Sequence, residues 1–136
     1  MARTQEARGA ETVLRFSEDD VWVRADGVQA QVGLADHGQA VLGEVIAVEL
    51  PEVGERIECG APFGEMESVR TVQELKAPVT GVVTAVNAEL AEHPELVNED
   101  PYHDGWLIEV KLSDEAELED LMPADEYEDL VSREEE

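Results

Sequence analysis

The sequence predicts a mainly β domain made of two small antiparallel sheets. Two runs of alternating apolar and polar residues flank Asp26-Gly27, and this arrangement is a strong signal for a β-hairpin. Farther along the chain, Gly43–Glu49 and Gly81–Asn87 share glycine, valine, alanine and valine in register. This repeat favours two similar half-sheets packed face to face, with a second hairpin lying between the halves.

The first half of the chain is expected to contain mainly strands and one short helix. Asp36 is placed to cap a brief helix through Leu42, and Gly43 can end that helix in a left-handed conformation. Pro51 stops the strand that follows the helix. The expected strands in this half are Val21–Val23, Val28–Val32, Glu44–Leu50 and a short one around Ile57.

The second half continues with strands and ends in helices. The spacing of Asp114 and Glu117 matches an N-cap whose partner reaches back to it, so a helix is expected to open there. The expected strands are Val82–Val86 and Trp106–Leu112. Helical turns are expected within Ala88–Val97, a helix through Leu118 and Leu121, and another around Tyr127, Leu130 and Val131 after Pro123.

The stretch Gly64–Gly81 is the predicted hairpin between the halves. Its middle is the short polar segment Glu67-Ser68-Val69-Arg70, and strand-like segments lie on both sides of it. If those segments pair, residue 70 lies at or beside an exposed tip. Exposed loops on a rigid scaffold commonly carry the functional group of a protein, so position 70 is the first candidate site.

The length of 136 residues suits one domain with one core. The predicted domain covers residues 13–131. Residues 1–12 are expected to form a flexible lead-in, and residues 132–136 a frayed acidic tail. Because only 4% of the residues are aromatic, the core should consist mainly of aliphatic side chains, with Trp22 and Trp106 as its largest members.

The charge of the chain limits its partners. Thirty-four acidic and nine basic residues give a formal net charge of −25, which repels nucleic acid and anionic lipid and favours only cationic partners. Adaptation to a salty cytoplasm is an alternative explanation for this acidity. The sequence contains neither a membrane-spanning apolar run nor the apolar segment of a secretory signal, so a soluble, cytoplasmic monomer is expected.

The residue types give no catalytic or metal-binding set. Cys59 is the only cysteine, and its acidic neighbours favour a packing role over a reactive thiolate. The three histidines, His37, His93 and His103, lack metal-ligand spacing. Ser68 has no local base and is interpreted as a backbone hydrogen-bonding residue. These observations favour a non-enzymatic binding or carrier module over an enzyme.

Several segments together resemble the H protein of the glycine cleavage system, from about Val13 to Arg133. The string from Pro94 to Tyr102 followed by Gly105-Trp106 is especially specific to that family. The other matching segments are Gly43-Glu44-Val45, Val48–Gly54, Glu67-Ser68-Val69, Ala77–Gly81 and Val86-Asn87.

The resemblance implies a barrel-sandwich hybrid of two small antiparallel sheets, the lipoyl- and biotinyl-carrier type, with short C-terminal helices. The family carries lipoic acid in amide linkage on a lysine at the hairpin tip, directly after Glu-Ser-Val. That arm moves an aminomethyl group between partner enzymes. The partners that the resemblance implies are glycine decarboxylase, aminomethyltransferase, dihydrolipoamide dehydrogenase and the lipoate-attachment enzymes.

This chain has Arg70 at the position that matches the lipoyl lysine. Lipoylation acylates an amine that must be unprotonated for part of the time, whereas arginine stays protonated because its pKa lies above roughly 12. We therefore expect no lipoylation of Arg70 and no lipoyl cofactor. Lys76, six residues on, is a possible substitute attachment site, but its place on the adjoining strand differs from that of a hairpin tip.

Three interpretations remain open at the level of sequence. The first is an H-like protein without a lipoyl arm that acts as a docking or interaction module, or simply as a scaffold with an inactive tip. The second is a working carrier, either through Lys76 or because Arg70 is an introduced substitution for a natural lysine. The third is an H-like carrier of another lipoate-linked pathway, such as sulfur oxidation.

Overall fold

The computed structural model describes residues 12–135 of the chain. Its strands are β1 (Val13–Phe16), β2 (Val21–Asp26), β3 (Gln29–Leu34), β4 (Val45–Glu49), β5 (Arg56–Ile57), β6 (Pro62–Ser68), β7 (Val72–Lys76), β8 (Gly81–Val86) and β9 (Ile108–Leu112). Its helices are α2 (Asp36–Leu42), α3 (Leu96–Glu99), α4 (Ala124–Glu135) and the 3-10 helices η1 (Ala88–Ala91) and η2 (Glu115–Asp120). Except for Thr12, the lead-in expected at residues 1–12 lies outside the described residues. No helix in the described range is long and apolar enough to cross a membrane.

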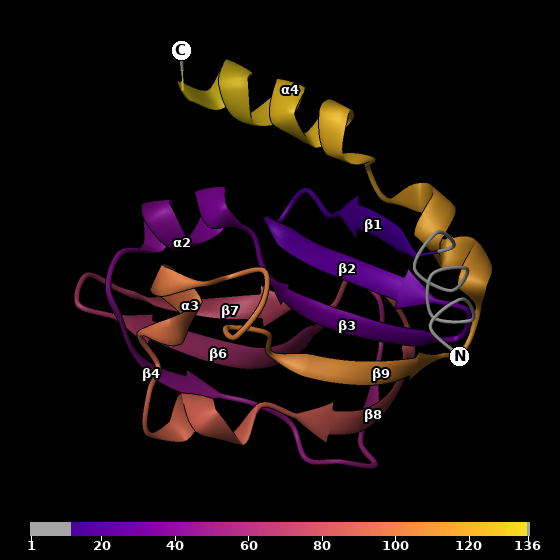
Figure 1. Cartoon of the computed structure of the whole chain (residues 1–136), viewed down its shortest axis with the longest axis horizontal. Coiled ribbons are helices and arrows are strands. Elements are labelled where there is room, and N and C mark those ends of the chain that lie inside the picture. Colours follow the sequence, from indigo (N-terminus) through magenta and orange to yellow (C-terminus); the bar gives the residue numbers. More distant parts are fainter. Residues whose placement is uncertain (1–11, 136) are drawn as a thin grey trace, which may run out of the picture.

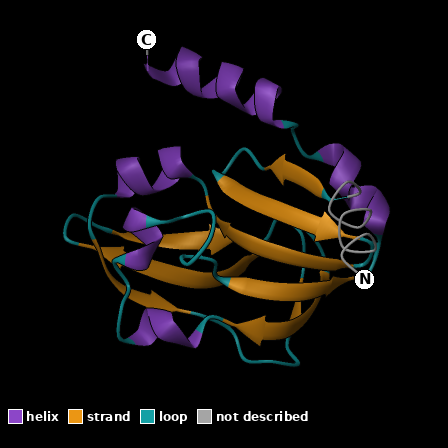
Figure 2. Ribbon diagram, in the orientation of Figure 1, coloured by secondary structure: helices purple, strands orange, loops and turns teal. Residues whose placement is uncertain are grey.

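The strands form two antiparallel sheets, as Figures 1 and 2 show. One sheet has six strands in the order β1-β2-β3-β9-β8-β5, and the other has three strands in the order β4-β6-β7. The predicted mainly β, two-sheet fold is therefore confirmed, and it is consistent with the barrel-sandwich arrangement that the resemblance implied. The sheets differ in size because β9 pairs with both β3 and β8 and so joins the first hairpin to the later strands.

The two repeated segments lie in different sheets. Gly43–Glu49 leads into β4 of the smaller sheet, and Gly81–Asn87 contains β8 of the larger one. The expectation of two similar half-sheets is wrong in detail, since the sheets contain three and six strands. The hairpin around Arg70 is also not between the halves, because its strands β6 and β7 belong to the smaller sheet.

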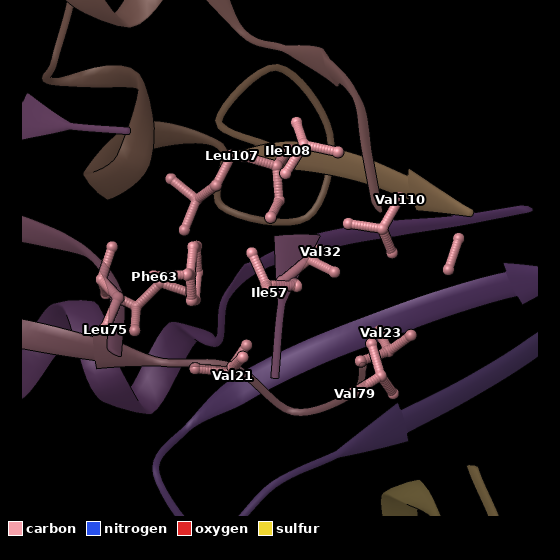
Figure 3. Packing of buried hydrophobic residues seen from close by; sticks show 14 of the residues in the cluster. Val21, Val23, Val32, Ile57, Phe63, Leu75, Val79, Leu107, Ile108 and Val110 are labelled. Carbon is pink, nitrogen blue, oxygen red and sulfur yellow. The ribbon is translucent and has the colours of Figure 1, made fainter. Parts of the chain in front are cut away.

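Alternation along the strands builds the main core between the sheets. In β2, Val21 and Val23 are buried on the inner face, and Val32 of β3 joins them. Figure 3 shows these valines with Phe63 and Leu75 of the smaller sheet's hairpin strands. Burial of such apolar side chains is the dominant favourable contribution to folding. The core thus fixes β6 and β7 against the larger sheet, so the hairpin has a rigid base.

A second apolar group, which we call the aromatic cluster, packs apart from this core. Trp22 is completely buried there, and its Nε1–H donates to the Pro101 carbonyl oxygen at 3.0 Å. A Cβ at Gly33 would lie 2.5 Å from the Trp22 ring, so glycine at that position admits the indole. Trp106 is only partly buried, contrary to its expected place in the core. The cluster contains Phe16, Trp22, Ala35 and Tyr127, with Tyr102, Trp106, Met122 and Val131 packed against them.

Tyr127 attaches the C-terminal helix α4 to the sheet. Its ring stacks on Phe16 with the ring centroids 4.4 Å apart and an interplanar angle of 5°. Its hydroxyl donates to Asp20 Oδ1 at 2.6 Å, and the same carboxylate oxygen lies 3.3 Å from His37 Nδ1. α4 runs to Glu135, so residues 132–135 are helical where the sequence analysis expected a frayed tail. An i,i+4 ion pair, Arg133 with Asp129 at 3.3 Å, lies in that last part.

The predicted helix caps are only partly correct. Gly43 follows α2 with φ 95°, as expected, but Asp36 is the first residue of α2 and Ala35 occupies the N-cap. Asp114 does cap η2 by accepting from the Ala116 amide at 3.0 Å. Glu117 does not reach back to that cap, because its carboxylate accepts from the Thr80 amide at 2.7 Å and from the Thr80 hydroxyl at 2.9 Å. A tertiary contact therefore replaces the expected local one.

Candidate functional site at the Arg70 hairpin tip

The β6–β7 hairpin places residue 70 at its tip, as the sequence predicted. Glu67 and Val72 are the last paired residues of β6 and β7 before the turn. Val69, Arg70 and Thr71 form the solvent-exposed turn that connects the two strands. Val69 is 61% exposed, and Arg70 is exposed as well. The tip therefore presents these side chains to solvent.

Ser68 holds the backbone of the turn. Its Oγ accepts from the amides of Arg70 at 3.1 Å and Thr71 at 3.2 Å, and its own amide donates to the Thr71 carbonyl oxygen at 2.8 Å. Ser68 is only 4% exposed. Its predicted role as a backbone hydrogen-bonding residue matches this geometry, and the tip conformation is set by the serine.

Asn98, on α3, holds the backbone beside the tip. Its Oδ1 accepts from the Val45 amide at 2.9 Å, and its Nδ2 donates to the Gly43 carbonyl oxygen at 2.9 Å and to Gln39 Oε1 at 2.8 Å. The adjoining Glu44 carbonyl accepts from the Val69 amide at 3.0 Å. One side chain on α3 thus ties α2 to the start of β4, and the Glu44 carbonyl oxygen links this segment to the hairpin. Sequence reasoning missed this role, although Asn98 lies in the string that carries the family resemblance.

The Arg70 side chain lies against the end of α2. Its Nη2 donates to the Ala40 carbonyl oxygen at 3.3 Å, within the last turn of that helix. A Cβ at Gly43 would lie 2.7 Å from Nε and Nη2 of Arg70, so glycine permits this approach. The last turn of α2 contains no basic residue of its own. A cation at a helix C-terminus interacts favourably with the helix dipole, and Arg70 supplies one from the hairpin.

Lys76 lies at the other end of the hairpin. It is the last residue of β7 and the register partner of Pro62 at the start of β6. Six residues of extended strand span roughly 20 Å, so the exposed Lys76 amine starts far from the position of Arg70. The structure therefore does not bring the two candidate attachment residues together.

The tip offers recognition chemistry rather than catalysis. Across the described residues, no group of three or more His, Cys, Asp or Glu side chains could hold a metal ion. A guanidinium can donate hydrogen bonds to an anion but does not provide the unprotonated amine that an amide-linked lipoyl group requires. The residue at position 70 hence does not fit attachment of that group.

Cys59 lies away from the tip and is exposed, so its predicted packing role is wrong. Its Sγ donates to the Pro78 carbonyl oxygen at 3.4 Å. Desolvation, together with the negative charges of Glu117 and Asp120, raises the pKa of the thiol. The thiol therefore resists ionisation, in agreement with the sequence-based argument against a reactive thiolate.

Comparison with known proteins gives consistent matches over nearly the whole chain. The family model described as glycine cleavage H-protein matches residues 14–134. A glycine cleavage system H protein of Brevibacillus brevis is 55% identical over 118 residues, which cover 87% of this chain and 94% of that protein. One of Halalkalibacterium halodurans is 49% identical over 121 residues, covering 89% and 94% respectively. The crystal structure of a glycine cleavage system H protein from Mycobacterium marinum matches with a TM-score of 0.77 at 32% identity, covering 84% of this chain and 92% of that one.

Proposed function

The chain belongs to the glycine cleavage H-protein family, and on that premise we propose that it docks with enzymes of the system without carrying a lipoyl arm. Proteins of this family are carriers, and the chain is not an enzyme. Its proposed partners are glycine decarboxylase, aminomethyltransferase, dihydrolipoamide dehydrogenase and the lipoate-attachment enzymes. It would meet these partners as a cytoplasmic monomer.

One observation carries the proposal: a fully braced hairpin tip presents Arg70 where the family presents an amine. Ser68 holds the turn through three hydrogen bonds to Arg70 and Thr71. Asn98 holds the segment beside it through three more, to Gln39, Gly43 and Val45. This geometry supports the proposal that the chain keeps the setting of the attachment residue. Only the chemistry of the side chain differs, because a permanently protonated guanidinium is not acylated under the conditions that acylate lysine.

An exchange assay tests this proposal. We expect no exchange of the glycine carboxyl carbon with bicarbonate when the chain is given the partner enzymes, lipoate and a lipoate-attachment enzyme. Arg70→Lys under the same conditions restores the amine, and we expect it to support exchange. If the unaltered chain supports exchange of the glycine carboxyl carbon, it carries a lipoyl arm and the proposal is wrong.

A second candidate function is a working lipoyl carrier, which the 55% identity to a glycine cleavage system H protein favours. In that case lipoate is attached to the exposed Lys76, or Arg70 is an introduced substitution for a natural lysine. Lys76→Arg tests attachment at Lys76, because it abolishes any carboxyl exchange that depends on a lipoyl group at that residue. A third possibility is an H-like carrier of another lipoate-linked pathway, such as sulfur oxidation. In that case even lipoylated Arg70→Lys should not support exchange of the glycine carboxyl carbon.

A further inference from the structure

His37, on α2, lies between two carboxylates that belong to different parts of the fold. Its Nδ1 is 3.3 Å from Asp20 Oδ1, in the turn between β1 and β2. Its Nε2 is 4.0 Å from Glu134 Oε1, near the end of α4, which lies on this side of α2 (Figure 1). The His37 side chain is 14% exposed, so water reaches only a small part of the ring. One residue of α2 thus meets both the sheet and the C-terminal helix.

The position of Asp20 is fixed by the backbone around it. Asp20 has a φ of 67°, in the left-handed region that aspartate tolerates better than most residues. Its carbonyl oxygen accepts from the Ala35 amide at 2.7 Å, directly before α2. A Cβ at Gly38 would lie 2.8 Å from the Asp20 Cβ, so glycine at that position admits the turn. Because Asp20 Oδ1 also accepts from the Tyr127 hydroxyl, the carboxylate is a fixed partner for His37.

The charged and titratable groups on the elements that meet at His37 are mainly acidic. Arg133, the basic residue in the last turn of α4, pairs with Asp129 at 3.3 Å. Tyr102 belongs to the same surroundings, since its hydroxyl accepts from the Asp36 amide at 2.9 Å. A protonated ring therefore meets a carboxylate at each of its nitrogens. The acidic groups are Asp20 of the turn, Asp36 of α2, Tyr102 between α3 and β9, and Tyr127, Glu128 and Glu134 of α4.

The two protonation states of the His37 ring make different contacts with these carboxylates. A neutral imidazole has one N–H, so it donates to one carboxylate and turns a lone pair toward the other. An imidazolium has an N–H on both nitrogens and attracts Asp20 and Glu134 together. Histidine ordinarily changes its charge between pH 5 and 8, where carboxylates stay ionised. Closure of α4 onto α2 therefore takes up a proton, and a falling pH within this range favours the closed helix.

We propose that His37 is a proton-dependent clamp that holds the last turns of α4 over α2. At pH 5.5 the ring bridges Asp20 and Glu134, and at pH 8 one of these two contacts is lost, so the end of α4 opens more often. Val131 in this part of α4 packs against the aromatic cluster, and opening therefore uncovers one side of that cluster. The clamp does not depend on whether the chain carries a lipoyl arm.

The beginning of α4 remains attached in both protonation states. The Tyr127 ring stacks on Phe16 and its hydroxyl donates to Asp20, and neither contact involves the histidine. The pH dependence is therefore expected at the end of the helix, in residues 131–134, rather than at its first turn.

Hydrogen exchange of the α4 amides at different pH values tests the clamp. Protection factors, corrected for the intrinsic pH dependence of exchange, are measured by NMR on the full chain at pH 5.5, 6.5 and 8 in about 0.15 M salt. For the amides of residues 131–134, we expect protection at pH 5.5 to be about two- to fivefold higher than at pH 8. This factor is the effect of one ion pair with a partly exposed partner.

Three variants assign the pH dependence to His37. His37→Gln keeps one side-chain donor but cannot gain a proton, so the ratio of protection at the two pH values should fall to about 1. Glu134→Gln removes the charge on α4 at a side chain that is 52% exposed, and the ratio should fall below about 1.5. His93→Gln is the matched control, because His93 lies 3.2 Å from Glu95 between η1 and α3, and it should leave the ratio unchanged.

The possible outcomes either support or overturn the clamp. A ratio of about 1 in the unaltered chain overturns it, and so does a ratio that persists in His37→Gln or is lost in His93→Gln. If circular dichroism shows that His37→Gln does not fold, Glu134→Gln decides, since its exposed side chain can be replaced without disturbing the core. A reduced ratio in Glu134→Gln then supports the clamp, and an unchanged ratio refutes it.

Discussion

The geometry of the hairpin tip depends on hydrogen bonds to its backbone, whereas that of the aromatic cluster depends on contacts between side chains. At the tip, Ser68 Oγ accepts hydrogen bonds from the turn amides, Asn98 holds the adjoining backbone at Val45, and the Arg70 side chain remains exposed. In the cluster, the buried rings of Trp22 and Tyr127 make the contacts themselves. The identities of the side chains in the cluster therefore determine stability, whereas the residue at position 70 can change with little effect on stability and a large effect on function.

The largest effect is expected in the cluster. Trp22→Ala removes a completely buried indole and should lower the free energy of unfolding by about 3–5 kcal/mol. Urea unfolding monitored by circular dichroism measures this change, with Trp22→Phe as the milder control. A loss below about 1 kcal/mol would contradict the assignment of the cluster as a stabilising unit.

A smaller loss in the free energy of unfolding is expected when Ser68, which holds the backbone of the tip, is replaced. Ser68→Ala leaves the amides of Arg70 and Thr71 without their common acceptor and should cost about 1–2 kcal/mol. Hydrogen exchange at those two amides should accelerate. Ser113, an exposed serine beyond β9, provides the control Ser113→Ala, which should leave both quantities unchanged. Unaltered exchange in Ser68→Ala would show that the turn does not depend on the serine.

The hydroxyl of Tyr127 predicts a pH dependence of stability in the aromatic cluster. Desolvation, followed by the hydrogen bond to Asp20, raises the pKa of Tyr127 far above its ordinary value of 10.0. An unfolded chain releases this proton near pH 10 while the folded chain keeps it. The stabilising contribution is therefore complete below pH 10 and is lost as the pH rises above it.

Urea unfolding at pH 8 and pH 11 measures this loss. Tyr127→Phe should cost about 1–3 kcal/mol at pH 8, because the bond to a carboxylate is removed. It should also show a smaller drop between the two pH values than the unaltered chain. Part of the drop persists, since desolvation also raises the pKa values of Tyr102 and Cys59. An identical drop in both proteins would contradict the role of the Tyr127 hydroxyl.

The smallest effect on stability is expected at the tip side chain. Arg70→Ala removes one exposed hydrogen bond to Ala40, so the free energy of unfolding should change by no more than about 0.5 kcal/mol. Thermal unfolding with Arg56→Ala as the exposed control measures it. A loss greater than about 1 kcal/mol would mean that Arg70 is retained for folding rather than for function.

The parts of the fold that the sequence predicted depend on short-range patterns. The alternation around Asp26-Gly27 and the polar segment before Arg70 both specify hairpins whose strands are close in the chain. The sequence alone therefore predicts that position 70 lies at the tip. The family resemblance then supplied what such a tip carries in related proteins.

The parts that the sequence did not predict depend on contacts between distant residues. Asn98 binds groups more than 50 residues away, and Glu117 reaches Thr80 rather than its own helix cap. Local spacing holds no information about such partners, so it predicts a cap role for Glu117 and misses the contact with Thr80. The pairing of β9 with both β3 and β8, which makes the sheets unequal, is equally non-local.

The most direct test of the central claim is the intact mass of the chain after co-expression with lipoate-attachment enzymes and lipoate. The chain contains two lysines, Lys76 and Lys111, and neither lies at the tip. We expect no lipoyl increment on the unaltered chain and one increment on Arg70→Lys, because the braced hairpin already presents position 70. A lipoyl increment on the unaltered chain, or none on Arg70→Lys, would contradict the account.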